Sequence, residues 1–184
     1  MAPSARTSDL TLRAVRRKAS AGVRLFTKFL CRLARTTPAN ARFAWTRVIS
    51  ARNVTASGFE SDPSDYHPPS DAIDGDSSTW WSNNGKDPWL QIDLDEAQSI
   101  CGISVEWNKG DSRDYAFEIG ISQDGNDYKK IFEGNNNKGS SEPEIYAFDQ
   151  ETNGKYLRVK VTSTSSNNGW VSIKDVNVLG LPDR

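Results

Sequence analysis

The chain has 184 residues, 36% of them hydrophobic and 26% charged, which suits one compact domain with an extension. No run of about 18 apolar residues occurs, so the sequence excludes a membrane-spanning helix. The net charge of −1 conceals two unlike parts, since residues 1–52 carry twelve Lys and Arg against a single acid, Asp9, while the remainder is strongly acidic.

The basic part, residues 1–47, is predicted to be an extension separate from the folded domain. Apolar residues recur at helical spacing over 12–33 with basic residues on the opposite face, a pattern that predicts a basic amphipathic helix. A transit segment, a helix on an anionic membrane, a binding arm for an acidic partner and a processed extension all fit this pattern. Residues 36–41 are predicted to be a linker.

The two cysteines, Cys31 and Cys101, fall one in each part of the chain. Because the folded part has no pair of its own, no disulfide framework is predicted there. Cys101 stands in the apolar run 100–103, and we expect it to be a small buried hydrophobic residue.

Residues 48–184 read as one all-β domain. Short runs that alternate apolar and polar residues predict strands over 89–94, 103–107, 115–121, 128–132, 144–148, 156–161 and 171–179. The dipeptides at 124–125 and 153–154 are typical of tight turns, and the polar run 134–141 is predicted to be a solvated loop. This succession favours a sandwich or a barrel. Trp81, Trp89 and Trp107 alternate with polar neighbours and are predicted to lie in the core, whereas Trp80 fits either place.

The acidic segment 71–81 offers oxygen ligands at nearly alternate positions, with Asp74, Asp76 and Thr79 around a flexible Gly75. Calcium takes about six to eight oxygen ligands, so this segment alone supplies only part of a calcium shell. By itself the segment also fits an ordinary acidic turn.

The order of segments 71–81, 89–94, 122–128, 155–159 and 171–180 resembles the discoidin domain, also called the coagulation-factor type C domain. That superfamily includes the family 32 carbohydrate-binding modules. The resemblance runs from about Val54 to Leu181 and implies a jelly-roll β-sandwich of two antiparallel sheets.

The resemblance also implies a structural calcium ion that would tie the acidic loop to the last strand. Carried over, its ligands are the carbonyls of Asp71 and Lys174 and the side chains of Asp74, Asp76, Thr79 and Asp175. The family usually has Glu where this chain has Asp175. Without a cation the clustered carboxylates would repel one another.

Members of this superfamily bind ligands through loops at one end of the sandwich. The candidate ligand residues here are Ser82, Asn83, Asn84, Lys109, Arg113, Asn168 and Trp170. Trp170 offers a flat face for a sugar ring, and Arg113 can clamp a carboxylate through two hydrogen bonds, which indicates an acidic sugar.

The sequence therefore predicts a non-catalytic carbohydrate-binding module with a structural calcium ion. Its expected partner is a glycan or polysaccharide, with a protein or a phospholipid membrane surface as the alternative and no nucleic acid. We expect a monomer at an extracellular or cell-surface location. No enzymatic role is predicted, because His67 has no evident partner in sequence and no carboxylate pair suited to glycoside hydrolysis stands out.

Overall fold

The computed structural model describes residues 30–31, 44–45 and 47–181, and side chains from residue 47 onward. The elements of the domain follow in the order β3 (Arg47–Ile49), β4 (Ala51–Ala56), β5 (Glu60–Asp62), β6 (Asp65–His67), η1 (Pro69–Ala72), β7 (Trp81–Asn83), β8 (Trp89–Trp107), β9 (Tyr115–Ser122), β10 (Lys129–Asn135), β11 (Glu144–Thr164) and β12 (Val171–Gly180). A separate pair, β1 (Leu30–Cys31) with β2 (Ala44–Trp45), precedes them. Among the described residues no helix is long and apolar enough to cross a bilayer.

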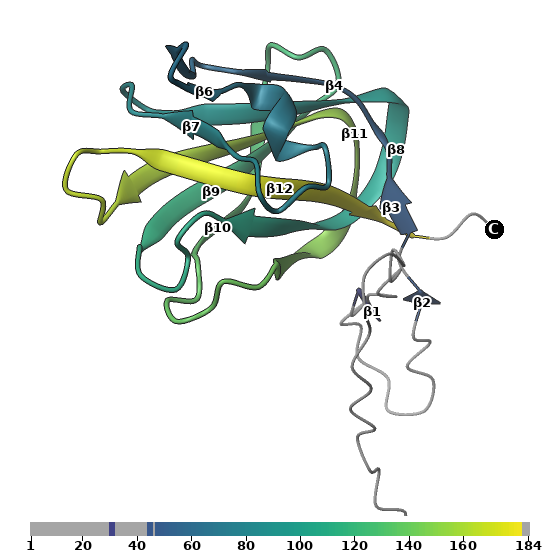
Figure 1. Ribbon diagram of the computed structural model, residues 1–184. Coiled ribbons are helices and arrows are strands. Elements are labelled where there is room, and N and C mark those ends of the chain that lie inside the picture. The colour runs from purple at the N-terminus through teal and green to yellow at the C-terminus, as the bar shows by residue number, and fades with distance from the viewer. Residues whose placement is uncertain (1–29, 32–43, 46, 182–184) are drawn as a thin grey trace, which may run out of the picture.

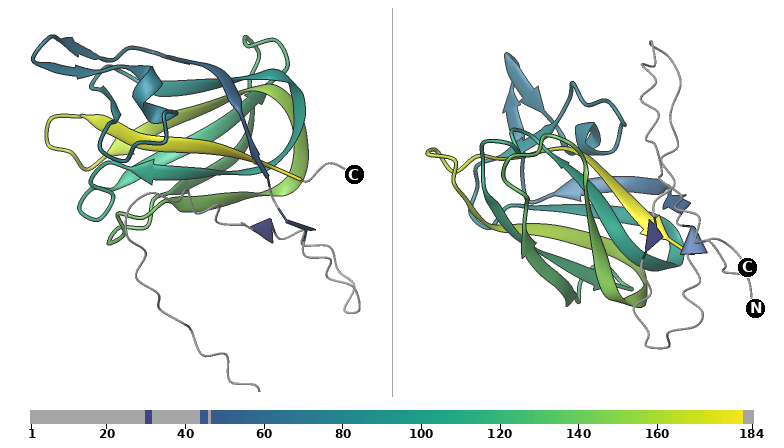
Figure 2. Two further views of the ribbon diagram at one scale, coloured as in Figure 1. Left: turned by 45° about the vertical axis from the view of Figure 1, so that its right-hand side comes forward. Right: turned by 90° about the horizontal axis from the view of Figure 1, so that it is seen from below.

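The strands form two packed layers in which every pairing is antiparallel (Figure 2). One layer has the order β4, β8, β11, β9, β10, and the other places β12 between β8 and both β3 and β7. The strands β8 and β11 take part in both layers, because their two halves pair with different neighbours. The predicted all-β sandwich is therefore confirmed.

The length of β8 and β11 differs from the sequence prediction, which split each into two separate strands. In β11 the register shifts near residues 147–152 and again near 154–156, and the strand bends there without ending. The predicted turn at 153–154 is wrong, since Asn153 pairs with Ser99 inside the ladder. A glycine is needed at position 154 for packing, because an added Cβ would collide with the side chain of Ile121. The predicted turn at 124–125 is present, with Gly125 at a φ of 81°.

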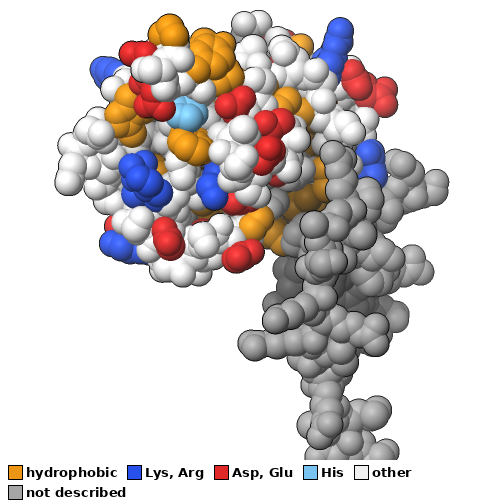
Figure 3. Space-filling view, in the orientation of Figure 1, with side chains coloured by type: hydrophobic (Ala, Val, Ile, Leu, Met, Phe, Trp, Pro, Cys, Tyr) orange, Lys and Arg blue, Asp and Glu red, His pale blue; other side chains and the backbone are white. Residues whose placement is uncertain are grey.

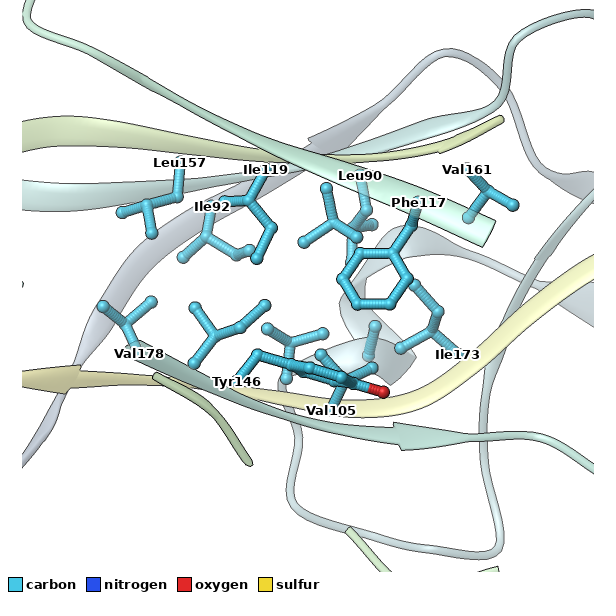
Figure 4. Packing of buried hydrophobic residues seen from close by; sticks show 14 of the residues in the cluster. Leu90, Ile92, Val105, Phe117, Ile119, Tyr146, Leu157, Val161, Ile173 and Val178 are labelled. Carbon is cyan, nitrogen blue, oxygen red and sulfur yellow. The ribbon is translucent and has the colours of Figure 1, made fainter. Parts of the chain in front are cut away.

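The core fills the space between the layers (Figure 4). Alternate residues of β8, β9 and β11 point inward from one layer, and residues of β8, β11 and β12 face them from the other. The labelled members are Leu90, Ile92, Phe117, Ile119, Leu157 and Val161 opposite Val105, Tyr146, Ile173 and Val178. Each such buried side chain contributes about 1.5–3 kcal/mol to stability.

The tryptophans follow the same alternation. Trp81 and Trp107 are fully buried in the core, as predicted. The core prediction for Trp89 is wrong, because Leu90 points inward and its neighbour must therefore point out of the layer. The Trp89 ring instead lies 4.1 Å from the guanidinium carbon of Arg158 on the outer face.

Gly102 on β8 lies against the backbone of β11, opposite Ala147. An added Cβ would stand 2.7 Å from the backbone oxygen of Tyr146, and neither backbone can move without disturbing the ladder. We expect Gly102→Ala to lower the free energy of unfolding by about 1–3 kcal/mol, measured by urea denaturation. Gly58→Ala is the matched control, since its Cβ would meet only ordinary contacts at 3.5 Å or more. Equal stability of the two variants would contradict this account.

The structure tests the predictions for the amino-terminal helix and for Cys101 only in part. Residues 30–31 are extended in β1, so the predicted helix is wrong at its carboxyl end; the rest of that helix and the linker at 36–41 lie outside the described residues. Cys101 is buried beside Leu179, as expected, but it is also disulfide-bonded, which the sequence analysis did not predict. The only other cysteine in the sequence is Cys31.

Candidate functional site

A hollow of about 260 Å³ lies among the loops at one end of the sandwich. In Figure 1 this is the end away from the last residues of β12. Three connections meet there: the β5–β6 hairpin, the β8–β9 loop and the β11–β12 loop. In Figure 3 the single histidine lies in this region among hydrophobic, acidic and basic side chains. The lining residues are Glu60, Asp65, His67, Trp80, Ser82, Asn108, Lys109, Arg113, Trp170 and Ser172.

The floor of the hollow is formed by two buried serines. Ser82 on β7 pairs with Ser172 on β12, and their hydroxyl oxygens are 2.7 Å apart. Both side chains face away from the core because their neighbours, Trp81 and Ile173, point into it. The backbone N–H of Asn108 donates to the carbonyl of Ser172, which attaches the β8–β9 loop to this floor.

The β5–β6 hairpin forms an acidic wall. Glu60 pairs with His67 and Asp62 with Asp65, so Glu60, Asp65 and His67 share the face that lines the hollow. The Nε2 of His67 lies 2.8 Å from Oδ1 of Asp65. The His67 ring also stacks on Trp80, with centroids 4.3 Å apart. The contact with Asp65 orients the ring within the hairpin, and the stack on Trp80 holds the hairpin against the rest of the domain.

The β8–β9 loop forms a basic wall opposite. Lys109 adopts a φ of 57°, a left-handed conformation that turns the chain, and its carbonyl accepts hydrogen bonds from the N–H groups of Ser112 and Arg113. Burial raises the pKa of Tyr115, and the nearby Arg113 guanidinium opposes that rise. The Tyr115 hydroxyl donates to the carbonyl of Asn108, which closes the loop.

Asn136 holds this basic wall from behind. Its Oδ1 accepts the N–H of Tyr115 at 2.7 Å, and its Nδ2 donates to the carbonyls of Gly110 and Arg113 at 3.2 and 2.9 Å. The side chain is buried, although the sequence analysis placed the whole run 134–141 in a solvated loop. That interpretation is wrong for Asn136, whose amide replaces backbone partners that the loop lacks.

The seven predicted ligand residues do not all meet at the hollow. Ser82, Lys109, Arg113 and Trp170 line it. Asn83 is buried and committed elsewhere, since its Nδ2 donates to Ser57 and its Oδ1 accepts the N–H of Gly85. Asn168 accepts a hydrogen bond from Ser166 within its own loop, and Asn84 is exposed; neither lines the hollow.

Six lining residues were missed by the sequence analysis: Glu60, Asp65, His67, Trp80, Asn108 and Ser172. The run 62–65 carried the missing signal, because Asp, Pro and Ser together are typical of a turn. Asp62 makes that turn through its Oδ1, which accepts the N–H of Ser64. A hairpin predicted there would have put Glu60 opposite His67.

The acidic loop 73–80 is closed by its own side chains. Asp74 accepts the N–H of Asp76 through Oδ1 and the hydroxyl of Thr79 through Oδ2, both at 2.8 Å, around Gly75 at a φ of 72°. Hydrogen bonds from Ser78 lower the pKa of Asp76. Partial burial raises the pKa of Asp71, and the charge of Asp74 raises it further.

Asp175 on β12 lies near this loop. Burial raises its pKa, and the charges of Glu106 and Asp74 raise it further, while a hydrogen bond from Asn177 opposes the rise. The side chain of Lys174 forms an ion pair with Glu106 at 3.3 Å. Within residues 47–181, no group of three or more His, Cys, Asp or Glu side chains could hold a metal ion by itself, so a calcium shell here would depend on carbonyl and hydroxyl oxygens as well.

Residues 53–176 match the F5/8 type C domain. The chain belongs to this family. The match begins inside β4 and ends inside β12, so it covers every strand and loop that builds the hollow.

Solved structures similar to this F5/8 type C domain are family 32 carbohydrate-binding modules (CBM32). The CBM32 of AlyQ, in complex with 4,5-unsaturated mannuronic acid, is 30% identical with a TM-score of 0.66 over 72% of this chain and 97% of that one. A pectin-binding carbohydrate-binding module is 31% identical with a TM-score of 0.65, covering 74% of this chain and 97% of the other. The domain is therefore CBM32-like.

Larger enzymes also contain a similar domain as a minor part. The polysaccharide lyase 8 family protein HylA of Enterococcus faecalis is 30% identical over 88 residues, which are 47% of this chain and 6% of the lyase. A truncated AlyQ with CBM32 and alginate lyase domains is 28% identical with a TM-score of 0.69, covering 77% of this chain and 35% of that chain. The matched part of the chain thus spans 6% of the lyase and about a third of the truncated AlyQ.

Proposed function

We propose that this F5/8 type C domain is a non-catalytic carbohydrate-binding module that holds a glycan in the end hollow. The observation that carries the proposal is the joint presence there of two tryptophans, Trp80 and Trp170, with charged and hydroxyl side chains around them. Tryptophan rings offer apolar faces to the C–H side of a sugar, and the polar groups at the rim can hydrogen-bond its hydroxyls.

The size of the hollow favours a short ligand. Its volume of about 260 Å³ falls just below the range of about 300–1,000 Å³ usual for small-molecule sites. A single sugar unit fits such a space, with the rest of a chain passing over the rim. A polysaccharide outside the cell or at its surface is the expected partner, which favours an extracellular or cell-surface location.

Calcium is proposed as a structural ion of the domain. The proposed ligands are all oxygens, and burial raises the pKa of Asp175, with the like charges of Glu106 and Asp74 raising it further. A hard divalent cation fits this excess of negative charge. Asp74, Asp76, Thr79 and Asp175, with the carbonyls of Asp71 and Lys174, would hold it, and the ion would supply only the tie between the loop and β12.

The first test is a glycan microarray with the full-length chain, in calcium and again in a chelator. Binding to a defined glycan class supports the proposal. Absence of binding by a folded, calcium-loaded protein on a broad array would contradict the proposal and favour a protein or phospholipid partner.

Trp170 provides the sharpest variant for this test. Replacing it with alanine is expected to weaken glycan binding by about 10–30-fold, because the sugar loses an aromatic face worth roughly 1.4–2 kcal/mol. Trp89→Ala is the matched control, since that ring packs on Arg158 outside the hollow. Isothermal titration calorimetry with the best array ligand checks both, and equal losses in the two variants would place the ligand elsewhere.

A further inference from the structure

The hollow separates its charges on two walls. Glu60 and Asp65 stand on the β5–β6 hairpin, whereas Lys109 and Arg113 stand on the β8–β9 loop. Among residues 47–181, neither Lys109 nor Arg113 forms an ion pair with a carboxylate, although other surface cations do. The two cations are therefore available to a ligand, and they share the hollow with carboxylates they do not contact.

We infer that the hollow selects a uronic acid unit, with the sugar carboxylate on Arg113 and Lys109 and the ring hydroxyls toward Glu60 and Asp65. This inference rests on the proposed function and names its ligand class. A guanidinium binds a carboxylate through two parallel hydrogen bonds. Ionised carboxylates only accept hydrogen bonds, so Glu60 and Asp65 suit the hydroxyl side of the sugar.

The same arrangement disfavours two other classes of sugar. A neutral hexose offers the basic wall only hydroxyl oxygens, which accept weaker hydrogen bonds from Arg113 and Lys109 than a carboxylate does. A sulfated sugar replaces a hydroxyl donor with an anion. Any sulfate on the hairpin side would face Glu60 and Asp65, and these like charges would repel one another. The walls therefore distinguish a single carboxylate from denser negative charge.

Both walls are held in place by contacts within the protein. His67 contacts Asp65 on one side and stacks on Trp80 on the other, which fixes the acidic wall. Asn136 bonds the carbonyls of Gly110 and Arg113, which fixes the basic wall. The separation of charge is thus built into the fold and requires no rearrangement on binding.

The test uses the full-length chain and calorimetric titration with five probes: oligogalacturonate, oligomannuronate, the methyl ester of each, and a sulfated galactan oligosaccharide that carries no carboxylate. Methyl esterification removes the charge and keeps the shape of the sugar. We expect at least one free acid to bind about tenfold or more tightly than its ester, a difference of roughly 1.4 kcal/mol. Equal affinity of acid and ester, or tighter binding of the sulfated probe, would overturn the inference.

Two sets of variants locate the effect. Arg113→Ala is expected to bring the acid to within about threefold of its ester, while Lys129→Ala, an exposed cation on β10 outside the hollow, leaves the preference unchanged. The double variant Glu60→Gln and Asp65→Asn is expected to strengthen binding of the sulfated probe. An unchanged preference in Arg113→Ala would contradict the inference.

The proposed function and this inference fail in different ways. A neutral glycan that binds in a Trp170-dependent manner, with no preference for acid over ester, would keep the proposed function and reject the uronate. Absence of binding to every array glycan and every probe would reject both.

Discussion

Replacing Asn136 with alanine is expected to lower the free energy of unfolding by about 2–4 kcal/mol and to weaken glycan binding by about tenfold. The Asn136 side chain is buried and makes three hydrogen bonds to backbone groups. Its loss leaves the N–H of Tyr115 and the carbonyls of Gly110 and Arg113 without that partner, and each buried polar group left unpaired costs about 1–3 kcal/mol. Part of this cost is recovered where water reaches the carbonyls.

The binding loss has a separate cause, because Asn136 does not line the hollow. Without its amide the β8–β9 loop is no longer held from behind, and Lys109 and Arg113 must be ordered by the ligand instead. Urea denaturation measures the stability change and calorimetric titration the binding change.

The run of three asparagines at 135–137 supplies the control. Asn137 is exposed, so Asn137→Ala should change stability by no more than about 0.5 kcal/mol and leave binding intact. A wild-type denaturation midpoint for Asn136→Ala, or equal effects of the two substitutions, would contradict the role assigned to Asn136.

Replacing Asp175 with asparagine is expected to have opposite effects with and without calcium. In calcium the wild-type protein should gain about 2.7 kcal/mol at an ion concentration 100 times the dissociation constant, or roughly 5–10 °C in Tm, and the variant should gain little. In chelator the variant should be the more stable protein by about 2–4 °C, because it lacks a partly buried charge near Asp74 and Glu106. Differential scanning calorimetry checks both.

The pH dependence of the chelated protein follows from the raised pKa of Asp175. A carboxyl whose pKa in the folded state lies above the ordinary value of 3.8 destabilises the folded state when it is ionised. The folded state therefore loses stability as the pH rises above about 3.8 and through the raised pKa, and the advantage of Asp175→Asn in chelator should shrink as the pH falls toward 4.

Asp127→Asn serves as the control for this series, because Asp127 is exposed in the β9–β10 turn and far from the acidic loop in the sequence. It should retain the full response to calcium. If wild type and Asp175→Asn respond equally to calcium, Asp175 is not a ligand; if neither responds, the domain has no structural calcium ion.

The sequence by itself determined the fold class and the family of this domain. Strict alternation in 89–94, 115–121 and 156–161 predicted strands with one buried face, and the structure buries the alternate residues Leu90, Ile119 and Val159. The order of short motifs indicated the type C superfamily, and the match over residues 53–176 confirmed it. Such signals are readable because side-chain alternation is a local property of a strand.

The tertiary structure alone decided which residues meet at the hollow. Arg113 and Trp170 were identified from their loops, but Glu60 and His67 reach the hollow only because antiparallel pairing places them on one face of a hairpin. Asn136 is distinguished from its two asparagine neighbours only by its partners, Gly110, Tyr115 and Arg113, which are 21–26 residues away in the chain.

The same reason explains the errors about Trp89 and Gly154. A tryptophan and a turn dipeptide have strong local preferences, and the sequence offered nothing against them. Strand register decides both positions. It places Leu90, and not Trp89, in the core, and it brings Ile121 so close to residue 154 that only a glycine fits there within β11. Register depends on the summed pairing of distant strands, so no local window of sequence contains it.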